Sequence, residues 1–151
     1  MEKRRLWNVA YYPIFLELAA KPVLVVGAGK VALRKAKGLI EAGAAVTIVA
    51  PRVEPEFARL AVTVRLRRFR SADLRGAVLA FAATDDRRVN HAVMLAACRL
   101  GIPVNVADAR DECSFIVPAR ITRGNIQIAI STSGESPRLA AALRRKIEEN
   151  L

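Results

Sequence analysis

The sequence contains little of several residue types that would assign a protein to a class at once. Its 151 residues include only two cysteines, one histidine and 5% aromatic residues. Cys98 and Cys113 are too few for a disulfide framework, and they do not have the spacing of a metal-ligand set. We therefore expect reduced thiols, a cytoplasmic protein and no metal centre.

Long apolar runs are also missing. No segment approaches the roughly 20 apolar residues that cross a bilayer, and the basic residues near the start are not followed by the apolar region of a signal peptide. The length is enough for one globular chain with a buried core. We expect no membrane partner.

Acidic residues are outnumbered by basic ones. The chain has 25 Lys and Arg against 14 Asp and Glu, which gives a net charge of +11. Such a field attracts nucleic acid, an anionic membrane surface or a small substrate with many carboxylates. Aromatic residues are few and no base-reading motif is visible, so nucleic acid is not an expected partner.

The stretch from Lys21 to Ala32, KPVLVVGAGKVA, is the centre of the pattern. The apolar run Pro22–Val26 predicts a strand buried on both faces, and a helical pattern follows directly. The connection reads G-x-G-x-x-A. In that motif Gly27 permits a tight turn, Gly29 lets a pyrophosphate approach the backbone, and Ala32 keeps the helix close to the sheet.

The helix start after this turn is a candidate anion site. Free N–H groups around Lys30 and Val31 would face a phosphate, helped by the positive end of the helix dipole. The alternative is a glycine turn in an α/β protein that binds no nucleotide. The strand before the turn and the helix after it favour dinucleotide binding.

Strands and helices alternate along the first two thirds of the chain. Tyr12–Leu16 reads as a lead-in strand or extended segment, and a short helix is expected near Ser71–Leu74. Further strands are expected at residues 45–50, 62–69, 77–83 and 103–107, the second of them with one wet face, and a helix at about 87–100. This alternation predicts an α/β fold with a Rossmann-like, doubly wound parallel sheet and right-handed crossovers.

The pattern changes after residue 113. Two extended runs, Ser114–Ile121 and Asn125–Ser131, flank Thr122-Arg123-Gly124 and predict a β-hairpin. Its exposed apolar residues favour pairing with a second subunit, so we expect a homodimer.

A last helix is expected to follow this hairpin. Ser136 is a good N-cap and Pro137 a good first helical residue. Leu139, Leu143 and Ile147 are expected to face inward.

Ligands of a doubly wound sheet lie beyond the carboxyl ends of its strands. Asp108 follows an apolar strand there and could transfer a proton, although capping of a turn is an equally open alternative. Asp85 and Asp86 are explained as residues that begin a helix. His91 reads as a solvated residue and Cys113 as an ordinary thiol.

Several segments together resemble the siroheme-synthase family. The resemblance covers nearly the whole chain in order, and more narrowly it is to the precorrin-2 dehydrogenases, some of which are also sirohydrochlorin ferrochelatases. The segments are YPIFLEL (12–18), VVGAGKVALRKAKGLIEAGA (25–44), AATDD (82–86), VNVADARDECSFIVPA (104–119) and ISTSGESPRLA (130–140).

The resemblance implies an activity and a site. It implies NAD-dependent oxidation of precorrin-2 to sirohydrochlorin in siroheme biosynthesis, with Asp108 as general base and as a participant in metal insertion where chelatase activity exists. The implied cofactor-binding residues are Gly27, Gly29, Lys30, Val31, Pro51, Arg52 and Thr84. The implied tetrapyrrole-binding residues are Asn105, Ser131, Thr132, Ser133 and Gly134.

The resemblance also implies a division of the chain. Residues 1–112 would form the NAD-binding Rossmann domain, and residues 113–151 a hairpin-plus-helix region for dimerisation and substrate binding, without the C-terminal helical region of longer relatives. That shortness weakens the expectation of chelatase activity more than that of dehydrogenase activity. Pro51-Arg52 stands where an acidic residue often binds the ribose hydroxyls, so NADP is an alternative cofactor. A non-catalytic NAD-binding regulatory module is the alternative function.

Overall fold

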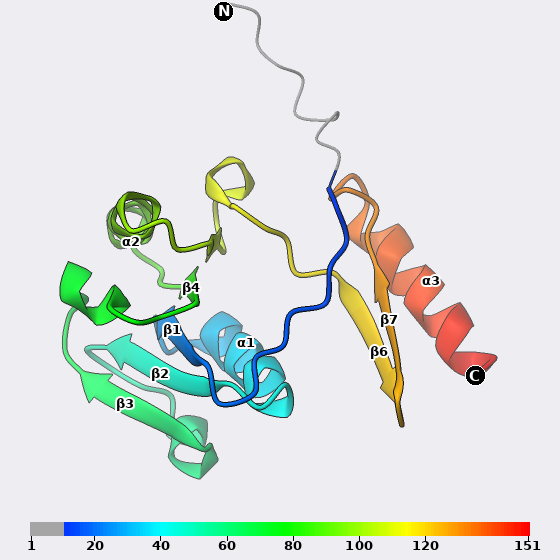
Figure 1. Ribbon diagram of the computed structural model, residues 1–151, viewed down its shortest axis with the longest axis horizontal. Helices are drawn as coiled ribbons and strands as arrows, with labels where there is room; N and C mark the ends of the chain where they lie inside the picture. The colour runs from blue at the N-terminus through cyan, green and yellow to red at the C-terminus, as the bar shows by residue number, and fades with distance from the viewer. Residues whose placement is uncertain (1–10) are drawn as a thin grey trace, which may run out of the picture. The chain divides into compact units, whose positions relative to one another are not determined.

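The computed structural model describes residues 11–151. These residues form two compact units, one of residues 16–115 and one of residues 116–151 together with 11–15. Each unit is described by itself (Figure 1). The compact units divide after Phe115, and the functional domain boundary expected after residue 112 stays a prediction.

The larger unit is built on a five-stranded parallel sheet. Its strands are β1 (Pro22–Val26), β2 (Ala45–Ala50), β3 (Val62–Leu66), β4 (Leu79–Ala82) and β5 (Val104–Val106). They lie in the order β3-β2-β1-β4-β5, and every neighbouring pair is parallel. The strand order reverses between β1 and β4, which confirms the doubly wound sheet and locates its switch point.

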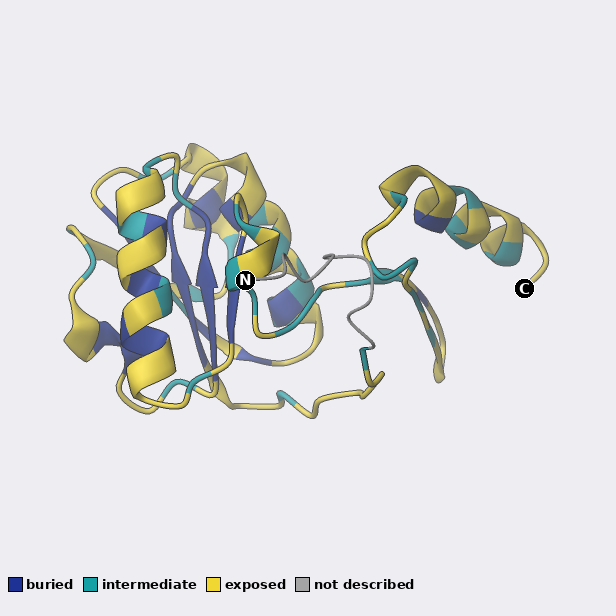
Figure 2. Cartoon of the chain, turned by 90° about the horizontal axis from the view of Figure 1, so that it is seen from above, coloured by how far each residue is buried: buried dark blue, intermediate teal, exposed yellow. Residues whose placement is uncertain are grey.

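Two helices, α1 (Lys30–Glu41) and α2 (Arg87–Arg99), cover the two faces of this sheet. Successive strand residues point to opposite faces, so β1 contributes to two separate cores. The core on the α1 face includes Val23, Val25, Ala32 and Ala36. The core on the α2 face includes Leu24, Val26, Val93 and Ala97. In Figure 2 the central strands are dark blue between helices whose outer surfaces are yellow, as the unbroken apolar strands predict.

The connections are short. Three of them are 3-10 turns, η2 (Pro55–Arg59), η3 (Ser71–Leu74) and η4 (Arg110–Glu112), and η3 confirms the short helix expected there. The edge strand β3 ends at Leu66, earlier than expected, and both Val64 and Leu66 are exposed, so neither of its faces is well covered. Residues 12–16 form no strand. Of the two alternatives expected for them, a strand or an extended segment, the strand is therefore wrong.

The smaller unit contains an antiparallel hairpin, β6 (Ala119–Arg123) and β7 (Ile126–Ile130), followed by α3 (Pro137–Glu149). Arg123 pairs with Ile126, so the turn is Gly124-Asn125 and not Thr122-Arg123-Gly124 as expected. Gly124 adopts a left-handed φ of 59°, which suits glycine.

Helix α3 begins as the sequence predicts, but the residues that it buries differ from the prediction. The side chain of Ser136 accepts a hydrogen bond from Leu139 N, and Pro137 is the first helical residue, as expected. Leu139 and Leu143, expected to face inward, are exposed, and Ala140 is the buried residue of the helix. A two-stranded hairpin covers only a narrow strip of the helix, which is why the wider apolar face is left uncovered. No helix within residues 11–151 combines the length and apolar content needed to cross a membrane.

Candidate active site

Four loops of the larger unit meet at the carboxyl edge of its sheet. Backbone hydrogen bonds join them beyond the strand ends: Gly27 N donates to Val49 O at 2.9 Å, Ala83 N to Val26 O at 2.8 Å, and Ala107 N to Ala82 O at 2.9 Å. The loops after β1, β2, β4 and β5 are therefore side by side. Most of the residues implied as cofactor-binding lie on them.

The two glycines of the turn have different surroundings. Gly27 is buried with a φ of 113°, and a Cβ added to it would lie 2.2 Å from the carbonyl oxygen of Ala83. Gly29 has an ordinary φ of −87°, and a Cβ there would have no atom within 4 Å. Glycine at position 27 is needed by the fold, whereas glycine at position 29 leaves open space in front of the helix.

The start of α1 has no cap from the protein's side chains. Gly29 is the N-cap, no side chain bonds to the first turn, and no acidic residue lies in it. The first helical hydrogen bond is from Leu33 N to Gly29 O, which leaves the N–H groups of the exposed residues Lys30 and Val31 without an intrahelical acceptor. These groups can hold a phosphate or pyrophosphate.

Pro51 and Arg52 are exposed residues directly after β2. The loop they begin is tied to the glycine turn by a hydrogen bond from Glu54 N to Ala28 O of 3.2 Å. No acidic side chain stands at either position. A ribose bound there would meet a guanidinium instead of a carboxylate.

Asn90 of α2 is the polar centre of the opposite side of the edge. It is fully buried. Its Oδ1 accepts from Thr84 N at 3.0 Å and lies 2.7 Å from Thr84 Oγ1, while its Nδ2 donates to Thr84 O at 3.0 Å and to Asp108 Oδ1 at 3.0 Å. One amide thus joins the loop after β4 to the loop after β5.

Asn90 was not among the residues predicted for the site, although the sequence contains one signal for it. The residue occupies the same helix face as Val93 and Ala97, both of which are buried. A polar residue at a core position is more informative than an apolar one, because it must find partners there.

Asp108 lies two residues beyond β5 with its side chain 39% exposed. Arg87 Nη1 is 4.0 Å from its Oδ1, the atom that Asn90 also binds. Within the described residues, no hydrogen bond or ion pair is made by Oδ2. Asp108 is therefore a partly sheltered carboxylate with one oxygen held and one available.

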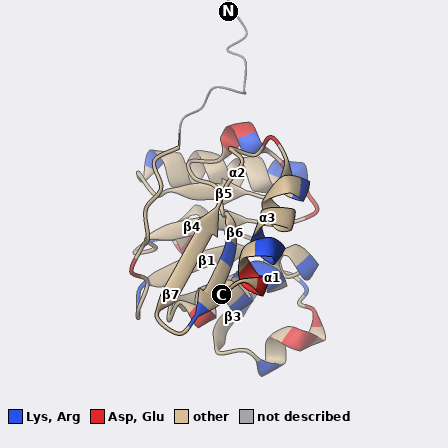
Figure 3. Ribbon diagram, turned by 90° about the vertical axis from the view of Figure 1, so that its right-hand side faces the viewer, with Lys and Arg blue, Asp and Glu red and all other residues tan. Residues whose placement is uncertain are grey.

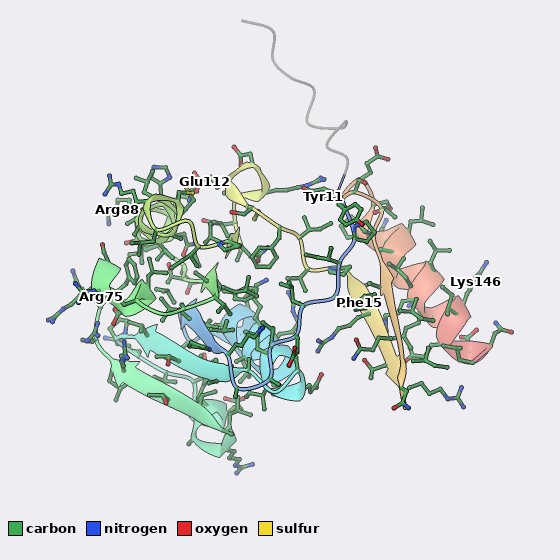
Figure 4. The ribbon with its side chains drawn as sticks, viewed as in Figure 1. Tyr11, Phe15, Arg75, Arg88, Glu112 and Lys146 are labelled. Carbon is green, nitrogen blue, oxygen red and sulfur yellow. The ribbon has the colours of Figure 1, made fainter. Side chains whose placement is uncertain are left out.

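A second carboxylate, Glu112 of η4, binds the other side of Arg87. Its Oε1 contacts Arg87 Nη2 and lies 2.9 Å from His91 Nδ1. The Arg87 hydrogen bond, and to a lesser extent His91, lowers the pKa of Glu112. Figure 4 marks Glu112 in the turn after β5 and Arg88 on α2. His91 is half-exposed and pairs with this carboxylate.

Asp86 lies at the start of α2, as expected from the sequence. Its side chain accepts from Arg88 N at 2.9 Å, which makes it the N-cap. The Arg88 side chain also binds it and lowers the pKa of Asp86.

Asn105 lies within β5 and is buried on the α1 face. Lys35 Nζ donates to its Oδ1 at 2.8 Å, and its Nδ2 donates to Phe115 O at 3.1 Å. The Lys35 side chain turns toward the sheet, and its ammonium lies 5.2 Å from the centre of the Phe81 ring. Burial lowers the pKa of Lys35, and the positive charge of Arg34 does so to a smaller extent.

Cys113 lies against the same strand. Its Sγ accepts from Val106 N at 3.1 Å and is close to the carbonyl oxygens of Val106 and Ala109. Both cysteines of the chain are free thiols. Within residues 11–151, no group of three or more His, Cys, Asp and Glu side chains is arranged to hold a metal ion.

The remaining implied residues, Ser131 to Gly134, belong to the smaller unit, between β7 and α3. This loop is held by its own hydrogen bonds: Thr132 Oγ1 accepts from Ser136 N at 3.1 Å, and Ser133 N donates to Ser131 Oγ at 3.0 Å. Ser133 and Gly134 both have left-handed φ angles, 52° and 75°. The roles implied for these residues and for Asn105 stay predictions.

Comparison with known families matches both parts of the chain. Residues 14–119 match a family described as putative NAD(P)-binding, and residues 123–150 match one described as sirohaem biosynthesis protein central. The siroheme synthase of Methylococcus capsulatus is 50% identical over 142 residues, which is 91% of this chain and 30% of that protein. Siroheme synthase 2 of Aeromonas salmonicida is 46% identical over 143 residues, which is 93% of this chain and 30% of that protein. The chain thus spans less than a third of the length of these relatives.

A solved structure is similar over most of both chains. It is that of SirC, precorrin-2 dehydrogenase, with a TM-score of 0.78 and 33% sequence identity, covering 93% of this chain and 71% of that one. The family follows from the two family matches and this structural relative, and the sheet with its uncapped helix start agrees with them. The chain belongs to the NAD(P)-binding family that contains siroheme synthases and the precorrin-2 dehydrogenase SirC.

Proposed function

We propose that this chain oxidises precorrin-2 to sirohydrochlorin with NAD as hydride acceptor, a step of siroheme biosynthesis. The observation that carries the proposal is the uncapped start of α1, which lies at the same sheet edge as the half-exposed carboxylate of Asp108. The substrate follows from the name of the relative SirC, precorrin-2 dehydrogenase. The wider activity of the longer siroheme synthases is not part of the proposal.

The glycine turn and the loops beside it are proposed to bind the cofactor. The N–H groups of Lys30 and Val31 would hold the pyrophosphate, which approaches through the space left by Gly29. Pro51 and Arg52 would contact the adenosine half. Thr84 would face the nicotinamide half with its methyl group, because its backbone and hydroxyl are already bound to Asn90.

Asp108 is proposed to take the proton that the oxidation releases. The reaction removes two hydrogens from precorrin-2. One hydrogen leaves its carbon as hydride, with both electrons of the broken C–H bond, and the resulting substrate cation then loses a proton. Bound NAD supplies the hydride acceptor. The free Oδ2 of Asp108 can accept the proton, and the products are NADH, a proton and sirohydrochlorin.

The charge of the chain suits this substrate. Precorrin-2 has eight carboxylates, and a chain of net charge +11 attracts such a polyanion. Lys and Arg positions are spread over the elements of both units rather than gathered at one (Figure 3). Asn105 and the loop from Ser131 to Gly134 are the candidates for tetrapyrrole contact. The two free thiols suit a reducing compartment, and we assign the protein to the cytoplasm as part of the proposal.

The test is a turnover assay with an isosteric variant. Wild-type protein is mixed with precorrin-2 and either NAD or NADP, and the absorbance of sirohydrochlorin is followed. We expect Asp108→Asn to lower kcat by about 10²–10⁴-fold, the usual contribution of a general base, with the NAD dissociation constant changed less than about twofold. Ferrous iron added to the product then reports any chelatase activity.

Two outcomes would contradict the proposal. A wild-type protein that binds NAD but forms no sirohydrochlorin with either cofactor would instead be a non-catalytic NAD-binding module. Undiminished turnover in Asp108→Asn would remove Asp108 from the mechanism while leaving the reaction in place.

A further inference from the structure

We propose that Asn90 is a positioning residue for this reaction: its buried amide holds Asp108 so that only Oδ2 is presented to the substrate. The inference rests on the proposed function, because it concerns the carboxylate that the function uses as a base. It adds a residue from a different element, α2, whose side chain need touch neither cofactor nor substrate.

The orientation of the Asn90 amide is decided by two backbone groups. Thr84 N can only donate and Thr84 O can only accept, so Oδ1 of Asn90 must face the first and Nδ2 the second. The remaining hydrogen of Nδ2 then points at Asp108 Oδ1, 3.0 Å away. Asp108 Oδ1 therefore acts as an acceptor in every protonation state of the carboxyl group that keeps this contact.

This arrangement makes the two oxygens of Asp108 unequal. A proton on Oδ1 would oppose the N–H of Asn90, whereas a proton on Oδ2 leaves that hydrogen bond intact. The carboxylate can thus change from base to acid without losing its anchor. A hydrogen bond to a charged group is also stronger than one between neutral groups.

The anchor is enclosed by the core of the larger unit. Asn90 is fully buried, and it lies in the interior of α2 on the face that also buries Val93 and Ala97. The same amide fixes the loop of Thr84, which the proposed function brings to the nicotinamide. One side chain on a rigid helix therefore sets the distance between the cofactor loop and the base, which a site on loops alone does not achieve.

The charged groups around Asp108 are those of α2 and η4. Arg87 Nη1 lies 4.0 Å from Oδ1, and Glu112 binds the same guanidinium and His91. Asp111 adds a further negative charge near Arg87. A new carboxylate at position 90 would replace the amide nitrogen that lies 3.0 Å from Asp108 Oδ1.

Asn90→Asp is the sharpest test because it preserves the shape of the side chain. The variant keeps an oxygen that can accept from Thr84 N. Its second oxygen replaces Nδ2, the atom that donates to Asp108 Oδ1 and Thr84 O in the wild type. We expect kcat to fall at least about tenfold at pH 7, with the NAD dissociation constant within about threefold of wild type. The acidic limb of the pH profile of kcat/KM should move up by about one pH unit or more.

Val93→Ala is the matched control. It removes packing from the same helix face one turn away and should lower the melting temperature through a small cavity. Because it leaves the amide network intact, its pH profile should keep the wild-type acidic limb. A merely structural role for Asn90 would make the two variants behave alike.

A second readout is independent of activity. The ¹³C NMR signal of the Asp108 carboxyl carbon is followed against pH in wild type and in Asn90→Asp. The signal is assigned by its loss in Asp108→Asn. We expect its midpoint to move to higher pH in the variant. If Asn90→Asp does not fold, Asn90→Ser, which is smaller and uncharged, carries the same test with a smaller shift in the same direction.

Unshifted titration of Asp108 in a folded position-90 variant would overturn the inference. A shifted titration in a protein that never oxidises precorrin-2 would support the link between Asn90 and Asp108 and count against the proposed function alone. If the wild type oxidises precorrin-2 and the Asp108 titration is unshifted in the position-90 variant, the proposed function is supported and the role of Asn90 is contradicted.

Discussion

Gly27 and Gly29 stand two positions apart in one turn, and the fold requires glycine only at the first of them. At Gly27 a Cβ would collide with the carbonyl of Ala83, and the φ of 113° is unfavourable for any other residue. At Gly29 neither constraint applies, since the space beside it is empty. The first glycine lets β1 pack against the loop after β4, and the second leaves open space at the proposed anion site.

The two alanine variants should therefore separate stability from binding. Gly27→Ala should lower the free energy of unfolding by more than about 2 kcal/mol, because strain and overpacking act together. Gly29→Ala should unfold within about 1 kcal/mol of wild type and bind NAD about tenfold or more weakly, since its Cβ enters the space of the pyrophosphate. Urea unfolding and calorimetric titration measure these effects. Equal NAD affinity in Gly29→Ala would contradict the proposed position of the pyrophosphate.

At the scale of elements, one carboxylate fastens the edge strand β3 to the turn η3. Asp73 is buried, with its side chain 2% exposed, and it accepts hydrogen bonds from the side chains of Arg65 and Arg67 and from Arg70 N. The Arg67 hydrogen bond is the main reason that the pKa of Asp73 falls to about 2; the Arg70 N–H and Arg65 lower it further, and burial opposes them. The strand has little core of its own, so this cluster compensates for its exposed apolar residues.

Asp73→Asn should show this contribution as a pH-dependent loss of stability. A carboxylate whose pKa falls from 3.8 in the unfolded chain to about 2 stabilises the fold above about pH 4, and the effect disappears as the pH falls through 2. At pH 7 the variant should lose about 1–2 kcal/mol, allowing for solvent screening at the half-exposed arginines. Urea unfolding at pH 7, 3 and 2 measures the loss.

The exposed Asp85→Asn serves as the reference for this measurement. It should change stability little at any of these pH values, because surface substitutions usually lie within about 0.5 kcal/mol. If Asp73→Asn were as stable as this reference at pH 7, the cluster would have no net stabilising effect.

At the scale of the whole molecule, the smaller unit leaves much of its apolar surface uncovered. Within the described residues its exposed large apolar side chains are Tyr12, Ile14, Phe15, Val117, Ile126, Leu139, Leu143 and Leu151. A hairpin with one helix is too small to bury this surface by itself. The homodimer proposed from the sequence would give it a partner.

Sedimentation should find the protein at twice the 16.5 kDa mass of one chain at micromolar concentration. Ile126→Glu, on β7, should raise the dimer dissociation constant by about tenfold or more, because it puts a charge into an apolar contact. Leu66→Glu, on the exposed edge strand of the larger unit, is the control and should leave the mass unchanged. A wild-type mass of one chain would contradict the proposed homodimer.

Much of the fold could be predicted because its signals are local. The apolar runs of β1 and β2, the G-x-G-x-x-A connection and the Ser136-Pro137 start of α3 each depend on neighbours within a few residues, and each was found at its expected place. The hairpin turn was misplaced because strand-forming residues extend on both sides of β6, and only the pairing of Arg123 with Ile126 determines the register.

The polar interior was decided by tertiary structure. Asn90 meets Asp108 across 18 positions, and Lys35 meets Asn105 across 70; neither pairing leaves a periodic signal in the sequence. Periodicity says which helix face is buried, and it cannot say which buried polar group will find a partner, because the partner comes from another strand. The sequence by itself determined the doubly wound sheet and its glycine turn. The arrangement of Asp108, with one oxygen anchored by Asn90, exists only because parallel strands bring their ends together.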